Sequence, residues 1–210
     1  MTKVSLDFTR PHSDAPTMKL KPLFLAVPLL LSAGLIYLSG ISGADEKPPP
    51  KTLTTADSQL TLNGTAIRTY FGIHVYQVGL YVMAPSDDEK SILSDPGRKR
   101  IQIKMLREVA GKKFDSTIRK NIAENFTNEE QEKFLAENER FLACFIDKIL
   151  AEDCVVDIDY VPNQGTEVLV DGKRADLIPG HDYYHTLLRL WIGKPLQKSI
   201  KHGLLGKPEV

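Results

Sequence analysis

The sequence predicts an α+β fold in which helices cover one face of an antiparallel sheet. Two observations lead to this prediction. Segments rich in β-branched and aromatic residues occur at 60–83, 100–107 and 155–178, and segments with helical spacing occupy 112–151 and 181–192. Blocks of strands that are separated from blocks of helices are typical of α+β folds, because a regular strand–helix alternation would instead indicate a parallel sheet.

The first two strands are expected at 60–71 and 74–83, with a tight turn at Gly72 between them. The run Ser86-Asp87-Asp88-Glu89 then predicts the start of a short helix, because these side chains can accept hydrogen bonds from free backbone N–H groups. Residues 100–107 alternate between apolar and polar side chains and predict a third strand.

Two helices are expected in the middle of the chain. The first spans 112–126, and its apolar stripe consists of Phe114, Ile118, Ile122 and Phe126. Thr127 and Glu130 form a capping box for the second helix, which is predicted to run to about Ala151. Its inward-facing residues are expected to be Phe134, Phe141, Phe145 and Ile149.

The last third of the chain predicts three strands and two helices. The strands are expected at 155–161, 167–170 and 174–178, and the helices at 181–192 and after Pro195. Asp171-Gly172-Lys173 is a hairpin signal between the last two strands, since Asp and Gly tolerate the left-handed backbone that tight hairpins need.

Composition and charge exclude several classes of protein. The chain has 210 residues, of which 42 % are hydrophobic, so it can bury a core of ordinary size. Its 27 basic and 27 acidic residues balance, which argues against nucleic acid as a partner. Neither a Cys/His cluster with metal-ligand spacing nor a GxGxxG or phosphate-binding loop occurs, so no metal and no cofactor is expected.

Residues 1–44 are predicted to be an N-terminal signal peptide or membrane anchor. Residues 23–41 are uncharged and largely apolar, and Ser42-Gly43-Ala44 offers small residues for signal cleavage. The apolar run is also near the length that spans a bilayer, so an uncleaved anchor in the inner membrane remains an alternative. Met18 is an alternative start. Both interpretations place the domain outside the cytoplasm, in the periplasm or secreted.

Residues 45–52 form a polar, proline-rich spacer, and 53–210 are expected to form the folded domain. The two cysteines, Cys144 and Cys154, lie close together in sequence. They are expected either to form a disulfide, as an oxidising compartment would favour, or to be two separate buried thiols.

Four stretches carry a resemblance to a known family: AIRTYFGIHVYQVGLYV, LSDPGRKRI, VAGKKF and IPGHDYYHTLLRLWIGKPLQKSIKHGLLG. In this order, over about 59–206, they resemble the chalcone isomerase-like family, in particular its bacterial secreted branch. The resemblance implies an open-faced β-sandwich with a ligand cleft between the sheet and the helices. The family contains plant chalcone–flavanone isomerases, plastid fatty-acid-binding proteins and proteins without known catalysis, so the fold alone does not assign an activity.

The resemblance also implies roles for single residues. Arg68 matches an arginine that reaches into the cleft, where it steadies negative charge in the isomerases and holds a carboxylate in the fatty-acid binders. Tyr76 stands where the fatty-acid binders have a tyrosine, and Asn121 matches an isomerase asparagine that contacts substrate. Phe114 replaces the catalytic tyrosine of the isomerases and has no proton to give. Leu190 replaces a small hydroxyl residue near the cleft.

Four of these residues, Arg68, Tyr76, Asn121 and Phe114, also have a purely structural interpretation. Arg68 could pair with an internal carboxylate, because a buried guanidinium is costly alone. Tyr76 could pack across strands, Asn121 could be an ordinary helix residue, and Phe114 could belong to the core.

The geometry of the first hairpin decides whether Arg68 and Tyr76 can act together. A two-residue turn at Gly72-Ile73 would place them on opposite faces of the sheet, whereas a three-residue turn would place them on the same face. The sequence accepts both.

The sequence therefore predicts a non-catalytic or weakly catalytic periplasmic binding protein for a fatty acid or similar amphipathic carboxylate. One alternative is an isomerase or intramolecular lyase of the chalcone isomerase type, and a second is a protein-interaction module. An apolar tunnel that ends at Arg68 would favour the binding protein, and a space filled by bulky side chains would favour the interaction module. Membrane contact is expected only through the N-terminal segment, and only if that segment is not cleaved.

Overall fold

The computed structural model describes residues 47–55 and 57–207, and Lys47–Val210 form a compact unit of their own. The predictions made for residues 1–44 lie outside the described residues. Within the described part of the chain, no helix is both long enough and apolar enough to cross a bilayer.

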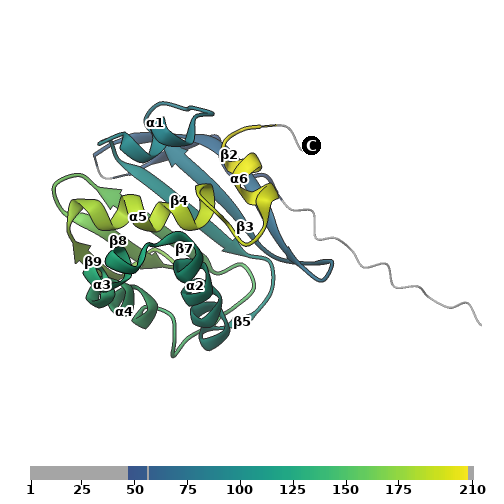
Figure 1. Cartoon of the computed structure of the whole chain (residues 1–210). Coiled ribbons are helices and arrows are strands. Elements are labelled where there is room, and N and C mark those ends of the chain that lie inside the picture. The colour runs from purple at the N-terminus through teal and green to yellow at the C-terminus, as the bar shows by residue number, and fades with distance from the viewer. Residues whose placement is uncertain (1–46, 56, 208–210) are drawn as a thin grey trace, which may run out of the picture. The chain divides into compact units, whose positions relative to one another are not determined.

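A seven-stranded antiparallel sheet forms the centre of this unit, with the strand order β1-β2-β3-β4-β7-β8-β9 (Figure 1). Its strands are β1 (Thr52–Thr54), β2 (Gln59–Tyr70), β3 (Ile73–Val82), β4 (Lys99–Met105), β7 (Val155–Val161), β8 (Gly165–Val170) and β9 (Lys173–Pro179). A separate short pair consists of β5 (Val109–Ala110) and β6 (Ile149–Leu150).

Six helices accompany the described strands. They are α1 (Glu89–Ser94), α2 (Gly111–Asn125), α3 (Asn128–Lys133), α4 (Leu135–Ala143), α5 (His181–Ile192) and α6 (Lys198–Leu204). Helix α5 crosses the sheet, with α2, α3 and α4 on the same side (Figure 1). Helix α6 packs on β2 and also contacts α5. The predicted α+β fold, with helices on one face of an antiparallel sheet, is confirmed.

The core lies between this sheet and its helices. In β4, every second residue is buried, and Ile101, Ile103 and Met105 belong to the main apolar cluster. The predicted stripe of α2 from Phe114 to Phe126 is also buried in that cluster, which confirms its inward orientation. Alternation along strands and helical spacing along α2 therefore meet in one core.

The helix predicted to run to Ala151 is wrong in its length. The capping box of Thr127 and Glu130 is present, but α3 ends at Lys133 and α4 ends at Ala143. Phe134 separates these two helices with a non-helical backbone. Ile149 is exposed rather than inward-facing, because it lies in strand β6 next to the buried Leu150 and strand residues alternate between two faces.

The turn between β2 and β3 differs from both predicted geometries. It is a two-residue turn at Phe71-Gly72, with both residues in the left-handed region, and it pairs Tyr70 with Ile73. Farther along, Arg68 pairs with Tyr76 and Thr69 with His74, so β3 has one extra residue between these pairs. This β-bulge, rather than the turn, shifts the register by one residue.

Cys144 and Cys154 are both buried free thiols. Burial raises the pKa of each thiol to about 11, so both are protonated at neutral pH. The structure therefore has the second of the two predicted alternatives, two separate thiols.

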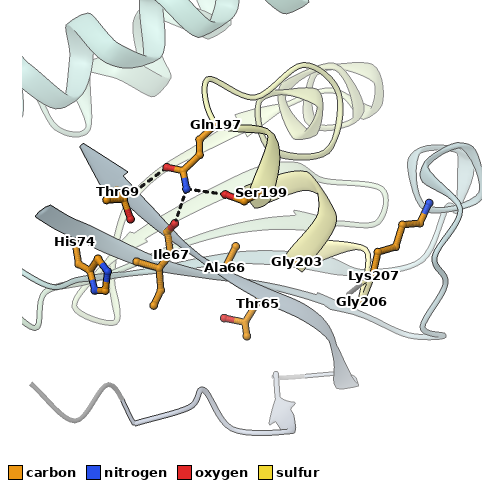
Figure 2. A pocket seen from close by; sticks show the side chains of 10 residues that line it. All are labelled: Thr65, Ala66, Ile67, Thr69, His74, Gln197, Ser199, Gly203, Gly206 and Lys207. Carbon is orange, nitrogen blue, oxygen red and sulfur yellow. Dashed lines mark hydrogen bonds between the residues drawn. The ribbon is translucent and has the colours of Figure 1, made fainter. Parts of the chain in front are cut away.

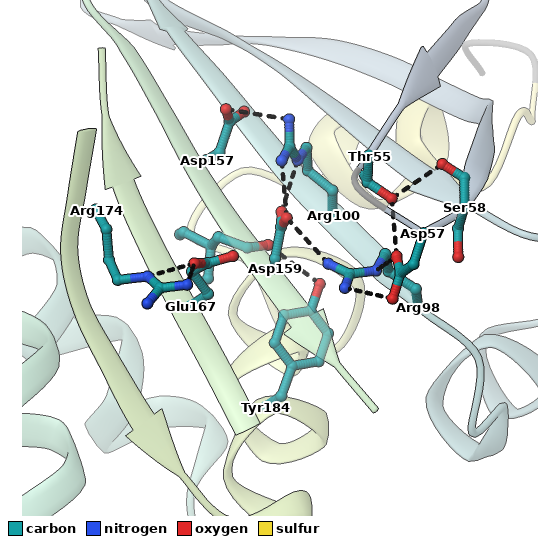
Figure 3. Close-up of polar contacts among 11 residues, drawn as sticks. Thr55, Asp57, Ser58, Arg98, Arg100, Asp157, Asp159, Glu167, Arg174 and Tyr184 are labelled. Atoms are coloured by element: carbon teal, nitrogen blue, oxygen red, sulfur yellow. Dashed lines mark hydrogen bonds and ion pairs between the residues drawn. The ribbon is translucent and has the colours of Figure 1, made fainter. Parts of the chain in front are cut away.

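The face of the sheet opposite the helical layer carries a buried ionic network (Figure 3). Arg100 of β4 donates to both carboxylate oxygens of Asp159, at 2.6 and 2.7 Å, and forms an ion pair with Asp157 at 3.1 Å. Arg98 lies 3.7 Å from Asp159 and also pairs with Asp57. The alternating charges of β4 and β7 thus neutralise each other across the sheet.

Candidate functional site

Arg68 and Tyr76 lie directly opposite each other on neighbouring strands and point to the same side of the sheet. This side faces the helices, because Val78 and Leu80, which have the same orientation in β3 as Tyr76, belong to the apolar core. Without the bulge, Arg68 would face Val75 and Tyr76 would point to the other side. The bulge therefore brings the side chains of Arg68 and Tyr76 to the same side of the sheet.

The guanidinium of Arg68 is bonded only to neutral oxygens. Its Nη1 donates to the carbonyl oxygen of Thr69 at 2.8 Å and to the side-chain oxygen of Gln197 at 3.0 Å. Among the ion pairs of residues 47–55 and 57–207, none includes Arg68, and its side chain is half-buried. A half-buried cation without a carboxylate can gain free energy by binding an anion.

Tyr76 is a hydrogen-bond donor at neutral pH. Burial raises its pKa to about 12, although the charge of Arg68 and a hydrogen bond with Trp191 act in the opposite direction. The indole N–H of Trp191 can only donate, so the phenol oxygen accepts from it and the phenol proton is left for another acceptor. A phenol with this pKa is a poor general base, but it can donate to a carboxylate.

Gln197 ties the loop before α6 to the outer edge of β2 (Figure 2). Its oxygen accepts from the backbone N–H of Thr69 at 2.9 Å, and its nitrogen donates to the carbonyl of Ile67 at 3.1 Å and to Ser199 at 2.7 Å. The amide thus makes the pair of bonds that a neighbouring strand would make. Its oxygen also occupies the position next to Arg68 where a ligand oxygen could bind.

A surface hollow of about 600 Å³ adjoins this edge. It is lined by Thr65, Ala66, Ile67, Thr69, His74, Gln197, Ser199, Gly203, Gly206 and Lys207 (Figure 2). Backbone and hydroxyl groups on its wall give it a mixed polar and apolar character. Arg68 does not line the hollow, but Gln197 lines it and also accepts a hydrogen bond from Arg68.

Replacing Gln197 by alanine is expected to lower the free energy of unfolding by about 1–3 kcal/mol, because it leaves the N–H of Thr69 and the carbonyl of Ile67 without their partner. Urea denaturation of both proteins measures the change. Ser199→Ala removes one bond to the same amide and is the matched control, with an expected loss of at most about 1 kcal/mol. Equal losses of unfolding free energy would show that the bonds from Gln197 to the backbone of β2 do not stabilise the domain.

The structure places Phe114 and Asn121 in the packing of α2 rather than beside Arg68. The ring of Phe114 lies edge-on to that of Phe145, with 5.1 Å between their centres. The amide nitrogen of Asn121 donates to the carbonyl of Leu190 at 2.8 Å, and its oxygen accepts from Asn125. Phe114 thus has the position of a core residue, and Asn121 links α2 to α5.

Bulky side chains occupy the space between the sheet and the helices. They include Phe114, Phe141, Phe145, Tyr183, Tyr184 and Trp191, all of them buried. The hollow beside β2 and three smaller surface hollows are not lined by any of Arg68, Tyr76, Phe114 or Asn121. Bulky side chains in this space are the feature predicted for an interaction module, whereas an apolar tunnel ending at Arg68 is the feature predicted for a binding protein.

No local pattern in the sequence marks Gln197 or Trp191 as part of the site. Gln197 lies in a loop without periodicity, and its contact with β2 spans 128 residues of sequence. Trp191 lies on the buried face of α5, where it looks like a core residue. Only the docking of α5 and α6 against the sheet reveals their contacts with Tyr76 and Arg68.

Comparisons with known proteins agree with this architecture. A solved structure, that of a fatty-acid binding protein of Arabidopsis thaliana, superposes with a TM-score of 0.57 at 16 % sequence identity, covering 75 % of this chain and 90 % of that one. The likeness shows a common fold. No curated protein sequence matches the chain significantly. A family model described as chalcone isomerase-like matches residues 44–206. The chain therefore belongs to the chalcone isomerase-like family.

Proposed function

We propose that this domain binds a fatty acid or similar amphipathic carboxylate without converting it, outside the cytoplasm. The observation that carries the proposal is the position of Arg68, a half-buried cation without a carboxylate partner in the described part of the chain, directly opposite the donor Tyr76. A ligand carboxylate can replace the oxygen of Gln197 next to Arg68 and accept the phenol proton of Tyr76. Membership of a family with this fold, and the fatty-acid binding protein that shares it, support the choice of ligand.

The head group and the tail contribute differently to binding. A charge-assisted hydrogen bond from Arg68 is worth about 1.5–3 kcal/mol, whereas burial of each methylene is worth about 0.8 kcal/mol. A long acyl chain therefore supplies most of the affinity, and Arg68 sets its direction. Because the space between sheet and helices is filled, the acyl chain enters by displacing side chains of α2 and α5. The ligand thus binds to an opened form of the domain.

The residues give little support to an isomerase. Phe114 cannot donate a proton or orient water, and the pKa of Tyr76 at about 12 makes its phenolate rare at neutral pH. Arg68 alone could still stabilise an oxyanion. A slow reaction of a substrate that ionises by itself is the most that these residues support.

A protein-interaction module is the second candidate, since bulky side chains fill the interior. Solvent extraction of the purified domain from Asp45 onward, followed by mass spectrometry, separates this candidate from the first. A stoichiometric fatty acid supports the binding protein. An empty domain that takes up no added fatty acid supports the interaction module.

Replacing Arg68 by alanine is expected to weaken binding of a fatty acid roughly tenfold to a hundredfold and to leave binding of the matching fatty alcohol nearly unchanged. The reason is that only the carboxylate pairs with the guanidinium. Fluorescence displacement or calorimetry with both ligands measures the two affinities. Arg174→Ala, which removes an exposed arginine of β9, is the control and is expected to change neither. Equal losses for acid and alcohol would contradict the head-group assignment.

A further inference from the structure

The tip of the β2–β3 hairpin exposes large apolar side chains. Phe71 is 87 % exposed, Tyr70 52 % and Ile73 50 %. Figure 1 shows that the turn between β2 and β3 projects beyond the helices. The rings of Tyr70 and Phe71 pack edge to face at 4.5 Å, so the tip is one convex apolar cluster.

Phe71 is an unfavourable residue for this turn. Its φ of 48° and that of Gly72, 77°, place both turn residues in the left-handed region. Two-residue hairpins with this backbone favour Asn-Gly, because a side chain with a bulky Cβ substituent is strained there. Phe71 therefore adds backbone strain to the cost of an exposed aromatic ring, of which only the side facing Tyr70 makes a ring contact among the described residues.

One basic side chain lies against this tip, and two more exposed basic residues occur in the segments beside its base. The ammonium of Lys113 lies 6.0 Å from the ring centre of Tyr70, and its neighbour Lys112 is exposed. Arg107, also exposed, follows Leu106, whose N–H donates to the carbonyl of Val75. Glu108 is the exposed acidic residue of the same loop. The tip therefore combines an apolar point with cationic flanks.

We propose that this hairpin tip inserts into the surface of a lipid bilayer that contains anionic phospholipids. Aromatic side chains are favourable at the boundary between head groups and acyl chains, and nearby lysines are attracted to anionic head groups. A narrow convex cluster can enter a deformable lipid surface, whereas a protein partner would need a matching groove. The inference goes beyond the proposed function, because it requires no bound fatty acid.

The central experiment compares the domain from Asp45 onward with its Phe71→Asn variant. Lys47–Val210 form a compact unit of their own, and omitting the apolar run 23–41 removes a second source of membrane binding. Sedimentation uses vesicles of phosphatidylcholine with phosphatidylglycerol, and vesicles of phosphatidylcholine alone. We expect the variant to bind the mixed vesicles about tenfold less. Its thermal midpoint should be unchanged or higher, because asparagine suits the turn.

Two further variants separate the parts of the interaction. Leu135→Asn removes an exposed leucine of α4 and is the control, with expected binding equal to that of the unmodified domain. The affinity of the double variant Lys112→Gln, Lys113→Gln for mixed vesicles should fall about fivefold per lysine. Its affinity for vesicles of phosphatidylcholine alone should change little.

Several outcomes would overturn the proposal. The first is an unmodified domain that binds neither kind of vesicle. The second is a Phe71→Asn variant that binds as well as the unmodified domain. The third is a Leu135→Asn variant that loses as much vesicle affinity as Phe71→Asn does. Analytical ultracentrifugation adds a fourth, a dimer that Phe71→Asn dissociates, which would assign the tip to a second copy. The proposal requires no bound fatty acid and none is added to the vesicles, so its failure is distinguishable from a failure of the ligand site at Arg68.

Discussion

Replacing Arg100 by methionine is expected to lower the free energy of unfolding by about 3 kcal/mol at neutral pH. The substitution keeps the length of the side chain but removes the cation between Asp157 and Asp159, whose side chains are 10 % and 2 % exposed. Breaking a buried ion pair costs about 3–5 kcal/mol, and the lower value is expected here because Arg98 still lies 3.7 Å from Asp159. Urea denaturation of the two proteins measures the difference.

The loss should depend on pH in a definite direction. Burial raises the pKa of both Asp157 and Asp159, and Arg100 opposes this shift, so the pKa values rise further in the variant. A carboxyl group whose pKa is raised by folding favours the folded state while it is protonated, and this contribution is lost as the pH rises through the folded pKa. The destabilisation of the variant should therefore be largest at neutral pH and should shrink as the pH falls into the range where these carboxyl groups protonate.

Arg174→Met is the matched control, because Arg174 also pairs with an acid on this sheet, Glu167, but its side chain is 60 % exposed. Exposed pairs contribute about 0–1 kcal/mol, so the expected loss is at most about 1 kcal/mol. Two results would contradict the conclusion that the buried ion pairs of Arg100 stabilise the fold. One is a similar loss of unfolding free energy in the two variants, and the other is a loss in Arg100→Met that does not diminish at acidic pH.

Replacing Gly203 by alanine is the second change with a large expected effect, a loss of about 3 kcal/mol or more. A Cβ at Gly203 would lie 2.4 Å from the carbonyl oxygen of Thr65, and that oxygen belongs to a strand that cannot shift freely. Alanine in a helix would gain about 0.5–1 kcal/mol over glycine. The clash outweighs this gain, so α6 must move away from β2.

Thermal and urea denaturation measure this loss, and the ligand site provides a second measurement. The loop before α6 carries Gln197, so displacement of α6 should also release its bonds to Ile67 and Thr69. Gly172→Asn is the control, because no atom lies within 4 Å of the added Cβ and asparagine tolerates a φ of 73°. A Gly203→Ala protein as stable as the unmodified one would show that α6 is not held at this distance.

Local patterns were sufficient for most elements of the fold. Helix α5 begins and ends where its apolar spacing predicts, and the capping box of Thr127 and Glu130 is present. The same patterns overextended the helix that contains Phe141, because apolar residues at helical spacing continue past Ala143 while the backbone turns into β6. Periodicity reports which side chains can be buried, and it does not report where a helix stops.

The sequence by itself determined the α+β class, the family and the identity of Arg68 and Tyr76 as candidate ligand residues, because strand alternation, helical spacing and family motifs are local properties of the chain. Only the tertiary structure decided that these two residues lie on the same side of the sheet. A single extra residue in β3 reverses the pairing of the side chains from Arg68 and Tyr76 up to the second register shift at Leu62–Gly64, and bulges of this kind depend on how the strands pair rather than on one local motif. The contact of Gln197 with β2 and the filled interior likewise follow from packing between segments distant in sequence, which no local pattern records.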